Sequence, residues 1–106
     1  MELHKKKCVP CEGGTPTLKP KETKEYIKNT PKWKSEKNHH LSREFNFKDY
    51  KSALKFVNKV SNIAENEGHH PDIQFGRGYV RITTYTHAIN GLSINDFILA
   101  AKIDKL

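Results

Sequence analysis

The stretch from Asn46 to Gly68, NFKDYKSALKFVNKVSNIAENEG, carries the strongest periodic signal in this chain of 106 residues. Asn46 with Asp49 three positions later resembles a capping box with Asn46 at the cap, and Gly68 stands where a helix C-terminal glycine is expected. The apolar residues recur at three- and four-residue steps, so the stretch predicts an amphipathic helix of about five turns. Its apolar positions are Tyr50, Ala53, Leu54, Val57, Val60, Ile63 and Ala64.

Upstream of this helix, two short strands are expected over residues 32–37 and 40–46. The second strand alternates apolar and polar side chains, as a half-buried strand does. A short, weakly anchored helix is predicted before them over residues 20–29, because that segment has helix-forming composition but few apolar positions. The pair His39–His40 falls at the turn between the strands and is interpreted as polar turn residues.

Downstream, the pattern predicts a hairpin and a last helix. Alternating apolar residues after Pro71 and the β-branched run 79–85 flank a glycine-containing turn at 76–78. Ser93 with Asp96 three positions later forms a second capping box, which opens the last helix. The expected order is helix, two strands, helix, two strands, helix. This order predicts an α+β fold in which a four-stranded antiparallel sheet has helices packed on one face.

The first 16 residues are expected to form a flexible N-terminal tail, followed by a single domain over residues 17–106. The tail is polar, rich in Pro and Gly, and without periodicity. Its one chemical feature is Cys8 and Cys11 in a Cys-x-x-Cys pattern, which is half of a zinc site or a redox dithiol. A closed zinc site needs two further ligands, for which His4 or His39–His40 are the candidates.

The formal net charge of +7 raises the question of nucleic-acid binding. The basic bias is mostly N-terminal, since residues 1–40 carry ten Lys and five acidic residues. The basic residues are not interleaved with aromatics, which favours a solvated surface over direct nucleic-acid contact. No apolar run is long enough for a membrane span, and no secretory signal is apparent. We therefore expect a cytoplasmic protein with reduced cysteines.

Ionisable residues gather at the predicted element ends: Glu65, His69, His70, His87 and Asp96. Three imidazoles and carboxylates without an evident Ser or Cys nucleophile suit proton transfer. The same set also matches a catalytic zinc site, although adjacent histidines tend to diverge. Purely structural roles, such as helix capping by Asp96, are the third interpretation.

The spacing of these residues resembles the pterin-4a-carbinolamine dehydratase family. The resemblance rests on Glu65–Pro71 (ENEGHHP), on His87 sixteen residues after Pro71, on Asp96 nine residues after that histidine, and on the upstream segment 45–50 (FNFKDY) with Trp33 before it. It covers about residues 31–103. It implies the α+β fold predicted above and a 4a-hydroxytetrahydrobiopterin dehydratase, a hydro-lyase that acts in tetrahydropterin recycling. The resemblance implies neither a metal nor an organic cofactor.

The resemblance also implies roles for individual residues. His69, His70 and His87 are expected to surround the substrate as catalytic groups. Asp96 is expected to orient His87, and Glu65 to support the adjacent pair. The implied substrate contacts are Gly68, Pro71, Tyr85, Thr86 and Ala88. The sequence departs from the family at Arg77, a position that is usually aromatic, which puts the pocket shape and substrate preference in question.

Family members in animals also bind a homeodomain transcription factor as its dimerisation cofactor. For this chain we expect a homodimer or homotetramer, because the apolar face of the long helix is wide enough for core and interface. A transcription-factor partner would extend its location to the nucleus. The alternative function is a non-catalytic binding module that acts on such a partner or on nucleic acid.

Overall fold

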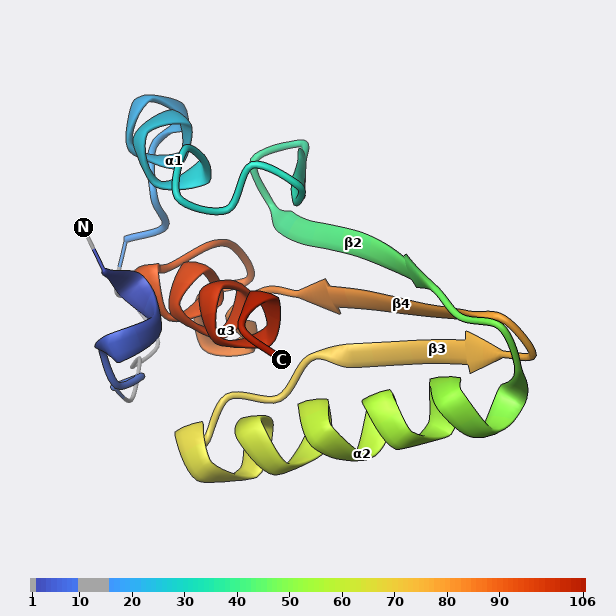
Figure 1. Ribbon diagram of the computed structural model, residues 1–106. Helices are drawn as coiled ribbons and strands as arrows, with labels where there is room; N and C mark the ends of the chain where they lie inside the picture. Colours follow the sequence, from blue (N-terminus) through green and yellow to red (C-terminus); the bar gives the residue numbers. More distant parts are fainter. Residues whose placement is uncertain (1, 10–15) are drawn as a thin grey trace.

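The computed structural model describes residues 2–9 and 16–106. Its order of helices and strands is the predicted one, preceded by a short 3-10 helix, η1 (Figure 1). The elements are η1 (Leu3–Lys5), α1 (Pro20–Ile27), β1 (Lys34–Glu36), β2 (His40–Asn46), α2 (Tyr50–Glu67), β3 (Asp72–Gly76), β4 (Tyr79–Thr84), η2 (His87–Ile89) and α3 (Ile94–Asp104).

The four strands form one antiparallel sheet in the order β1-β2-β4-β3, which confirms the predicted α+β class. Alternation along β4 buries Val80 and Ile82, while Arg81 between them is exposed. Leu41 on β2 is also fully buried and pairs with Thr84 across the ladder. α2 contacts β3 and β4, and the buried side chains of α3 share one core cluster with those of β2 and β4 (Figure 1). The fold therefore has one layer of helices on one layer of sheet.

The N-cap residue of α2 lies three positions later in the chain than the sequence pattern predicts. Asp49, and not Asn46, is the N-cap residue, because its carboxylate accepts a hydrogen bond of 2.8 Å from the backbone N–H of Ser52. Asn46 is still paired in β2, opposite Tyr79. The prediction of Gly68 as the terminal glycine is confirmed, since it adopts the left-handed conformation with φ 64°. The chain consequently turns sharply just before the two adjacent histidines.

The last helix, α3, is buried along almost its whole length. Its predicted capping box is present, with the Asp96 carboxylate accepting from the backbone N–H of Ser93. At its other end Asp104 accepts hydrogen bonds from the Trp33 indole at 2.8 Å and from Arg43 at 2.6 Å. These contacts tie the C-terminal end of α3 to β2 and to the segment before β1.

Residues 2–9 pack against α3, although their polar composition predicts little order (Figure 1). Leu3 is only 1% exposed and joins the core cluster, and the side chain of Cys8 is buried as well. Two apolar side chains are sufficient here because α3 offers an uncovered apolar side. Of the rest of the expected tail, Met1 and residues 10–15, with Cys11, lie outside the described residues.

None of the helices in the described part of the chain is both long and apolar enough to cross a membrane.

Candidate active site

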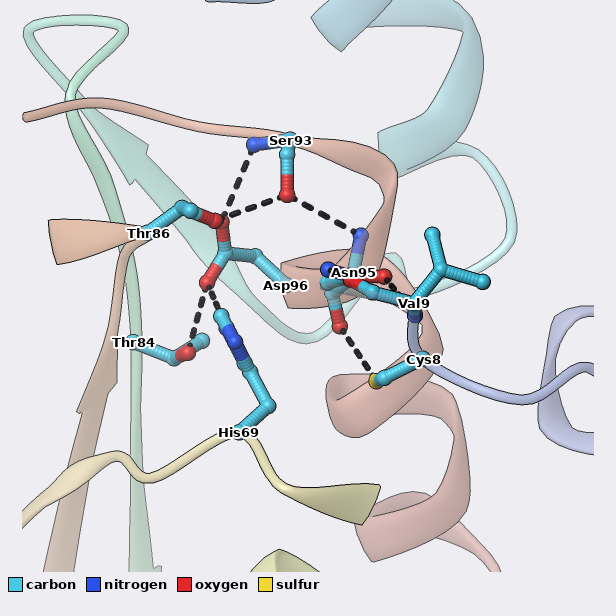
Figure 2. Close-up of polar contacts among 8 residues, drawn as sticks. All are labelled: Cys8, Val9, His69, Thr84, Thr86, Ser93, Asn95 and Asp96. Carbon is cyan, nitrogen blue, oxygen red and sulfur yellow. Dashed lines mark hydrogen bonds and ion pairs between the residues drawn. The ribbon is translucent and has the colours of Figure 1, made fainter. Parts of the chain in front are cut away.

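A buried carboxylate, Asp96, lies at the centre of the polar network between β4 and the start of α3 (Figure 2). Its Oδ2 accepts hydrogen bonds from the Thr86 hydroxyl at 2.9 Å and from the Ser93 backbone N–H at 3.0 Å. Its Oδ1 accepts from the Thr84 hydroxyl at 2.7 Å. A carboxylate this deeply buried needs such donors, because an unpaired charge there is costly. Three donors, from β4, from the residue before η2 and from the cap of α3, thus hold the Asp96 side chain in place.

The fourth partner of Asp96 is His69, whose Nε2 lies 2.7 Å from Oδ1. The His69 side chain is 10% exposed and Asp96 is not exposed at all. The other three contacts of Asp96 are all donated to it, so His69 Nε2 is the donor in this fourth contact and Nδ1 is the ring nitrogen left to the pocket. Asp96 therefore fixes both the orientation of the ring and its tautomer.

His70 has a more open environment. Its Nε2 lies 2.6 Å from Oε1 of Glu65 at the end of α2, and its side chain is 60% exposed. The expected support of the adjacent pair by Glu65 therefore reaches His70. The two neighbouring histidines have different partners, one buried and one in solvent, so they are not equivalent.

The expected pairing of Asp96 with His87 is wrong, because Asp96 holds His69. The chain leaves β4 at Thr84 and enters the short helix η2, which begins at His87. The ring of His87 instead packs on Tyr85, with 4.2 Å between the ring centroids, and is exposed. An isolated bridge between Thr86 and Gly91 closes this loop. The change of direction after β4 turns His87 away from the buried carboxylate.

One pocket of about 290 Å³ brings together the two histidine segments. It is lined by Val9, Gly68, His69, His70, Thr86, His87, Ala88 and Asn95. All three predicted catalytic histidines and three of the predicted substrate contacts, Gly68, Thr86 and Ala88, are therefore in its wall. Asp96 and Glu65 stand behind His69 and His70 respectively. Tyr85 contacts the ring of His87, and Pro71 continues the chain from His70 into β3.

Arg77 lies in the turn between β3 and β4, at the far end of the hairpin from the histidines (Figure 1). It is exposed and does not line the pocket. Phe75 packs against Tyr50 on α2, with 5.4 Å between the ring centroids. Arg77 therefore belongs to the hairpin turn and not to the walls of the pocket.

Sequence reasoning missed Thr84, Ser93, Asn95 and Val9 as residues of the site. Ser93 was identified only as a helix cap, although its hydroxyl also lies 2.7 Å from that of Thr86. The position of Thr84 was predictable, because it lies on the same face of the strand as Val80 and Ile82. A polar residue on that buried face needs a hydrogen-bond partner. Val9 gave no signal, because it lies in a segment without periodicity.

Within residues 2–9 and 16–106, no three His, Cys, Asp or Glu side chains form a cluster suited to a metal ion. Burial is the main factor that raises the pKa of the Cys8 thiol to about 12, with the charge of Glu67 adding to it. Cys8 is therefore a buried thiol near neutral pH. Its Sγ lies 3.5 Å from the backbone oxygen of Asn95.

Fold and site together define a small α+β protein in which buried and exposed imidazoles share one pocket. The family model described as Pterin 4 alpha carbinolamine dehydratase matches residues 16–106. The chain belongs to this family of dehydratases, which are hydro-lyases.

Two bacterial relatives match over nearly their whole length, and both are provisionally named pterin-4-alpha-carbinolamine dehydratase. The one from Rubrobacter xylanophilus is 49% identical, over 99% of this chain and 98% of its own. The one from Alkaliphilus metalliredigens is 51% identical, over 97% of this chain and 94% of its own.

Two solved structures are similar in fold. The transcriptional coactivator/pterin dehydratase from Brucella melitensis has a TM-score of 0.79 at 27% identity, covering 85% of this chain and 97% of the other. A pterin dehydratase-like protein described as a RuBisCO assembly factor in the alpha-carboxysome has a TM-score of 0.60 at 28% identity. That match covers 69% of this chain and 86% of the other.

Proposed function

We propose that this protein is a 4a-hydroxytetrahydrobiopterin dehydratase, which removes water from pterin-4a-carbinolamine to give the quinonoid dihydropterin. The observation that carries the proposal is the convergence of His69, His70 and His87 on one pocket from two separate segments. Family membership and the names of the relatives support the same reaction. The reaction needs one proton delivered and one removed, and imidazole does both near neutral pH.

The two adjacent histidines divide these tasks in our proposal. His69 has its proton held on Nε2 by Asp96, so Nδ1 accepts the proton that leaves the ring nitrogen next to the hydroxyl-bearing carbon. His70 is exposed and exchanges protons with solvent, so it delivers a proton to the departing hydroxide, which leaves as water. The C–O bond breaks as the C=N bond forms. His87 lines the same pocket from the segment after β4 and completes the set of imidazoles around the substrate.

The test is the initial rate of quinonoid dihydropterin formation from a freshly generated 4a-hydroxytetrahydropterin, measured against the spontaneous reaction. Wild-type protein is expected to accelerate it, and His69→Ala combined with His70→Ala to reduce that acceleration by about 10²-fold or more, the usual contribution of acid–base groups. His4→Ala is the matched control, because His4 lies on η1 and does not line the pocket. Wild-type protein without acceleration, or a double variant with an unchanged rate, contradicts the proposal.

The alternative is a non-catalytic binding module. Its support is the name of the Brucella melitensis structure, which includes transcriptional coactivator, and the net charge of +7. Binding to duplex DNA at low salt, with a steep loss at higher salt, would favour a nucleic-acid partner. The homo-oligomeric state, the transcription-factor partner and the cytoplasmic location stay predictions, each open to direct measurement.

A further inference from the structure

The segment Cys8–Val9 forms a wall of the histidine pocket that lies outside the residues matched by the family model. That model begins at residue 16, whereas Val9 lines the pocket next to His69 and His70. Val9 is 59% exposed, so its side chain is accessible to a ligand in the pocket. It is also the most apolar of the lining residues, since the others are histidines, polar residues, Gly68 and Ala88. An exposed apolar group beside a polar pocket is a candidate contact for a bound ligand.

Asn95 holds this wall in place. Its Oδ1 accepts a hydrogen bond of 3.0 Å from the Val9 backbone N–H, and its Nδ2 donates to the Val9 backbone oxygen (Figure 2). Asn95 is itself only 2% exposed, so its amide is fixed by the surrounding α3. Two hydrogen bonds to one residue define both the position and the orientation of the Val9 backbone. The backbone of Val9 is therefore held at the edge of the pocket in a fixed position.

A second anchor stands immediately before Val9. The backbone N–H of Cys8 donates to Oε1 of Glu67 at 2.8 Å, and Glu67 Oε2 pairs with Lys102 at 2.8 Å. Glu67 belongs to α2 and Lys102 to α3, so the segment is fixed to both helices. The wall is thus pre-formed in the ligand-free protein, which lowers the cost of ordering it when a ligand binds.

The residue that holds this wall and the carboxylate that orients His69 share one turn of α3. Asn95 reaches the N-terminal segment, while its neighbour Asp96 reaches His69, as Figure 2 shows. The distance between the apolar wall and the imidazole is consequently set by two successive residues of one helix. This arrangement suits a flat ligand that packs one face or an apolar substituent on Val9 while its polar edge meets His69.

We propose that Val9 is a substrate-binding, specificity-determining residue and that Asn95 is the positioning residue that holds it at the pocket. The proposal rests on the proposed function, because it takes a reduced pterin as the ligand. We expect Val9 to favour reduced pterins that direct an apolar group or a ring face towards its side chain.

The first experiment replaces Val9 with Ser in the full-length protein and measures KM and kcat for the dehydration. Loss of an apolar contact is expected to raise KM by about threefold to tenfold with kcat nearly unchanged. Val9→Ile, which keeps an apolar side chain, is expected to stay within about twofold of the wild-type KM. Lys7→Ala is the matched control, because Lys7 lies in the same segment, bonds the backbone oxygen of Asn66 and does not line the pocket.

The second experiment tests whether Asn95 acts through Val9. Asn95→Ala is expected to raise KM about as much as Val9→Ser, and the double variant no further than either alone. Hydrogen exchange at the Val9 amide in the ligand-free protein is expected to be faster in Asn95→Ala, which a direct contact of Asn95 with ligand would not require. Additive effects on KM, or unchanged exchange, would overturn the positioning role.

A binding measurement separates this proposal from the proposed function. Titration calorimetry with a 7,8-dihydropterin, which has no hydroxyl to lose, reports affinity without turnover. If wild-type protein neither binds it nor accelerates dehydration, the proposed function itself is wrong, and the role of Val9 falls with it. If wild-type protein is active but Val9→Ser keeps the wild-type KM and affinity, only the role of Val9 is overturned.

Discussion

Asp96 shows how much of the site depends on a single side chain. Four donors meet its two oxygens, from Thr84, Thr86, Ser93 and His69. Ser93 supplies a backbone N–H through the helix cap, so a local motif contributes to the same network that orients the imidazole. The capping residue Ser93 thereby also belongs to the network that orients His69.

Replacing Asp96 with Asn is expected to reduce the dehydration rate by about 10- to 100-fold, the usual cost of losing an orienting partner. The amide has the same size but brings an N–H₂ group to a place where every neighbour donates, so at least one donor loses its acceptor. Each buried donor left unpaired costs about 1–3 kcal/mol, so the free energy of unfolding is also expected to fall. Steady-state kinetics and urea unfolding measure the two effects.

Thr84 provides the matched pair of control variants for this network. Thr84→Ser keeps the hydroxyl that donates to Asp96 and is expected to retain most of the activity. Thr84→Val removes that donor while keeping the shape, so its rate should fall between those of wild-type protein and Asp96→Asn. Equal rates for Ser and Val at this position would mean that the network does not orient His69.

At the scale of the elements, the two ends of α2 place the site. The N-cap sets where the helix starts, and Gly68 sets where the chain leaves it towards His69. The 18 residues between them carry the chain from the end of β2 at one edge of the molecule to the pocket (Figure 1). An error of one residue at the end of the helix would rotate the histidine pair away from Asp96.

The cap of α2 is testable with a pair of neighbouring positions. Asp49→Ala is expected to lower the urea midpoint, because the backbone N–H of Ser52 loses its acceptor. Asn46→Ala is expected to have a smaller effect, since Asn46 lies in β2 and does not cap the helix. Hydrogen bonding by Ser52 also holds the pKa of Asp49 below its ordinary value. The difference in urea midpoint between Asp49→Ala and wild-type protein should therefore shrink as the carboxyl is protonated in acid.

Gly68→Ala is expected to destabilise the protein by about 1 kcal/mol and to lower activity as well. A Cβ at this position would meet no atom within 4 Å, so the cost comes from the left-handed backbone alone, where an L-residue is strained. Gly68→Asn is the control, because Asn tolerates this conformation better than Ala. Equal losses of stability for the two variants would argue against backbone strain as the cause.

At the scale of the whole molecule, the N-terminal segment joins helices that are distant in sequence. Glu67 at the end of α2 bonds both the Cys8 backbone and Lys102 on α3. Leu3 adds a fully buried contact with the core. The segment therefore stabilises the same corner of the fold that contains the pocket, and its removal would affect both stability and the site.

The contacts of Glu67 with Lys102 and Cys8 should make the stability of the protein depend on pH. Burial alone would raise the pKa of Glu67, but hydrogen bonds from Lys102 and the Cys8 backbone, with the charge of Lys102, hold it below its ordinary value of 4.5. A carboxyl with a lowered folded-state pKa contributes stability above its unfolded pKa and loses it as the pH falls through the folded value. Urea unfolding is expected to show that the free energy of unfolding falls less between pH 7 and pH 3 for Glu67→Gln than for wild-type protein. An equal loss for the two proteins would contradict the prediction.

The elements were predictable because their signals are local. The period of α2, the alternation in β2 and β4 and the capping box at Ser93 each lie within a few residues and need no tertiary contact. The cap of α2 was misplaced because Asn46 and Asp49 are both good capping residues, and pairing with Tyr79 decides which of them is free to cap. The order of Leu3 was missed because one apolar residue gives no period.

The sequence alone determined the α+β class, the turn of the hairpin, the start of α3, and the set of ionisable residues from which the site is built. Only the tertiary structure decided which residues meet: Asp96 with His69, Glu65 with His70, and Val9 beside both histidines. The physical reason is the distance along the chain over which the two kinds of interaction act. Helix and strand patterns arise from neighbours along the chain, whereas a carboxylate selects its donor according to the direction in which the chain leaves β4 and the angle at which α3 packs on the sheet.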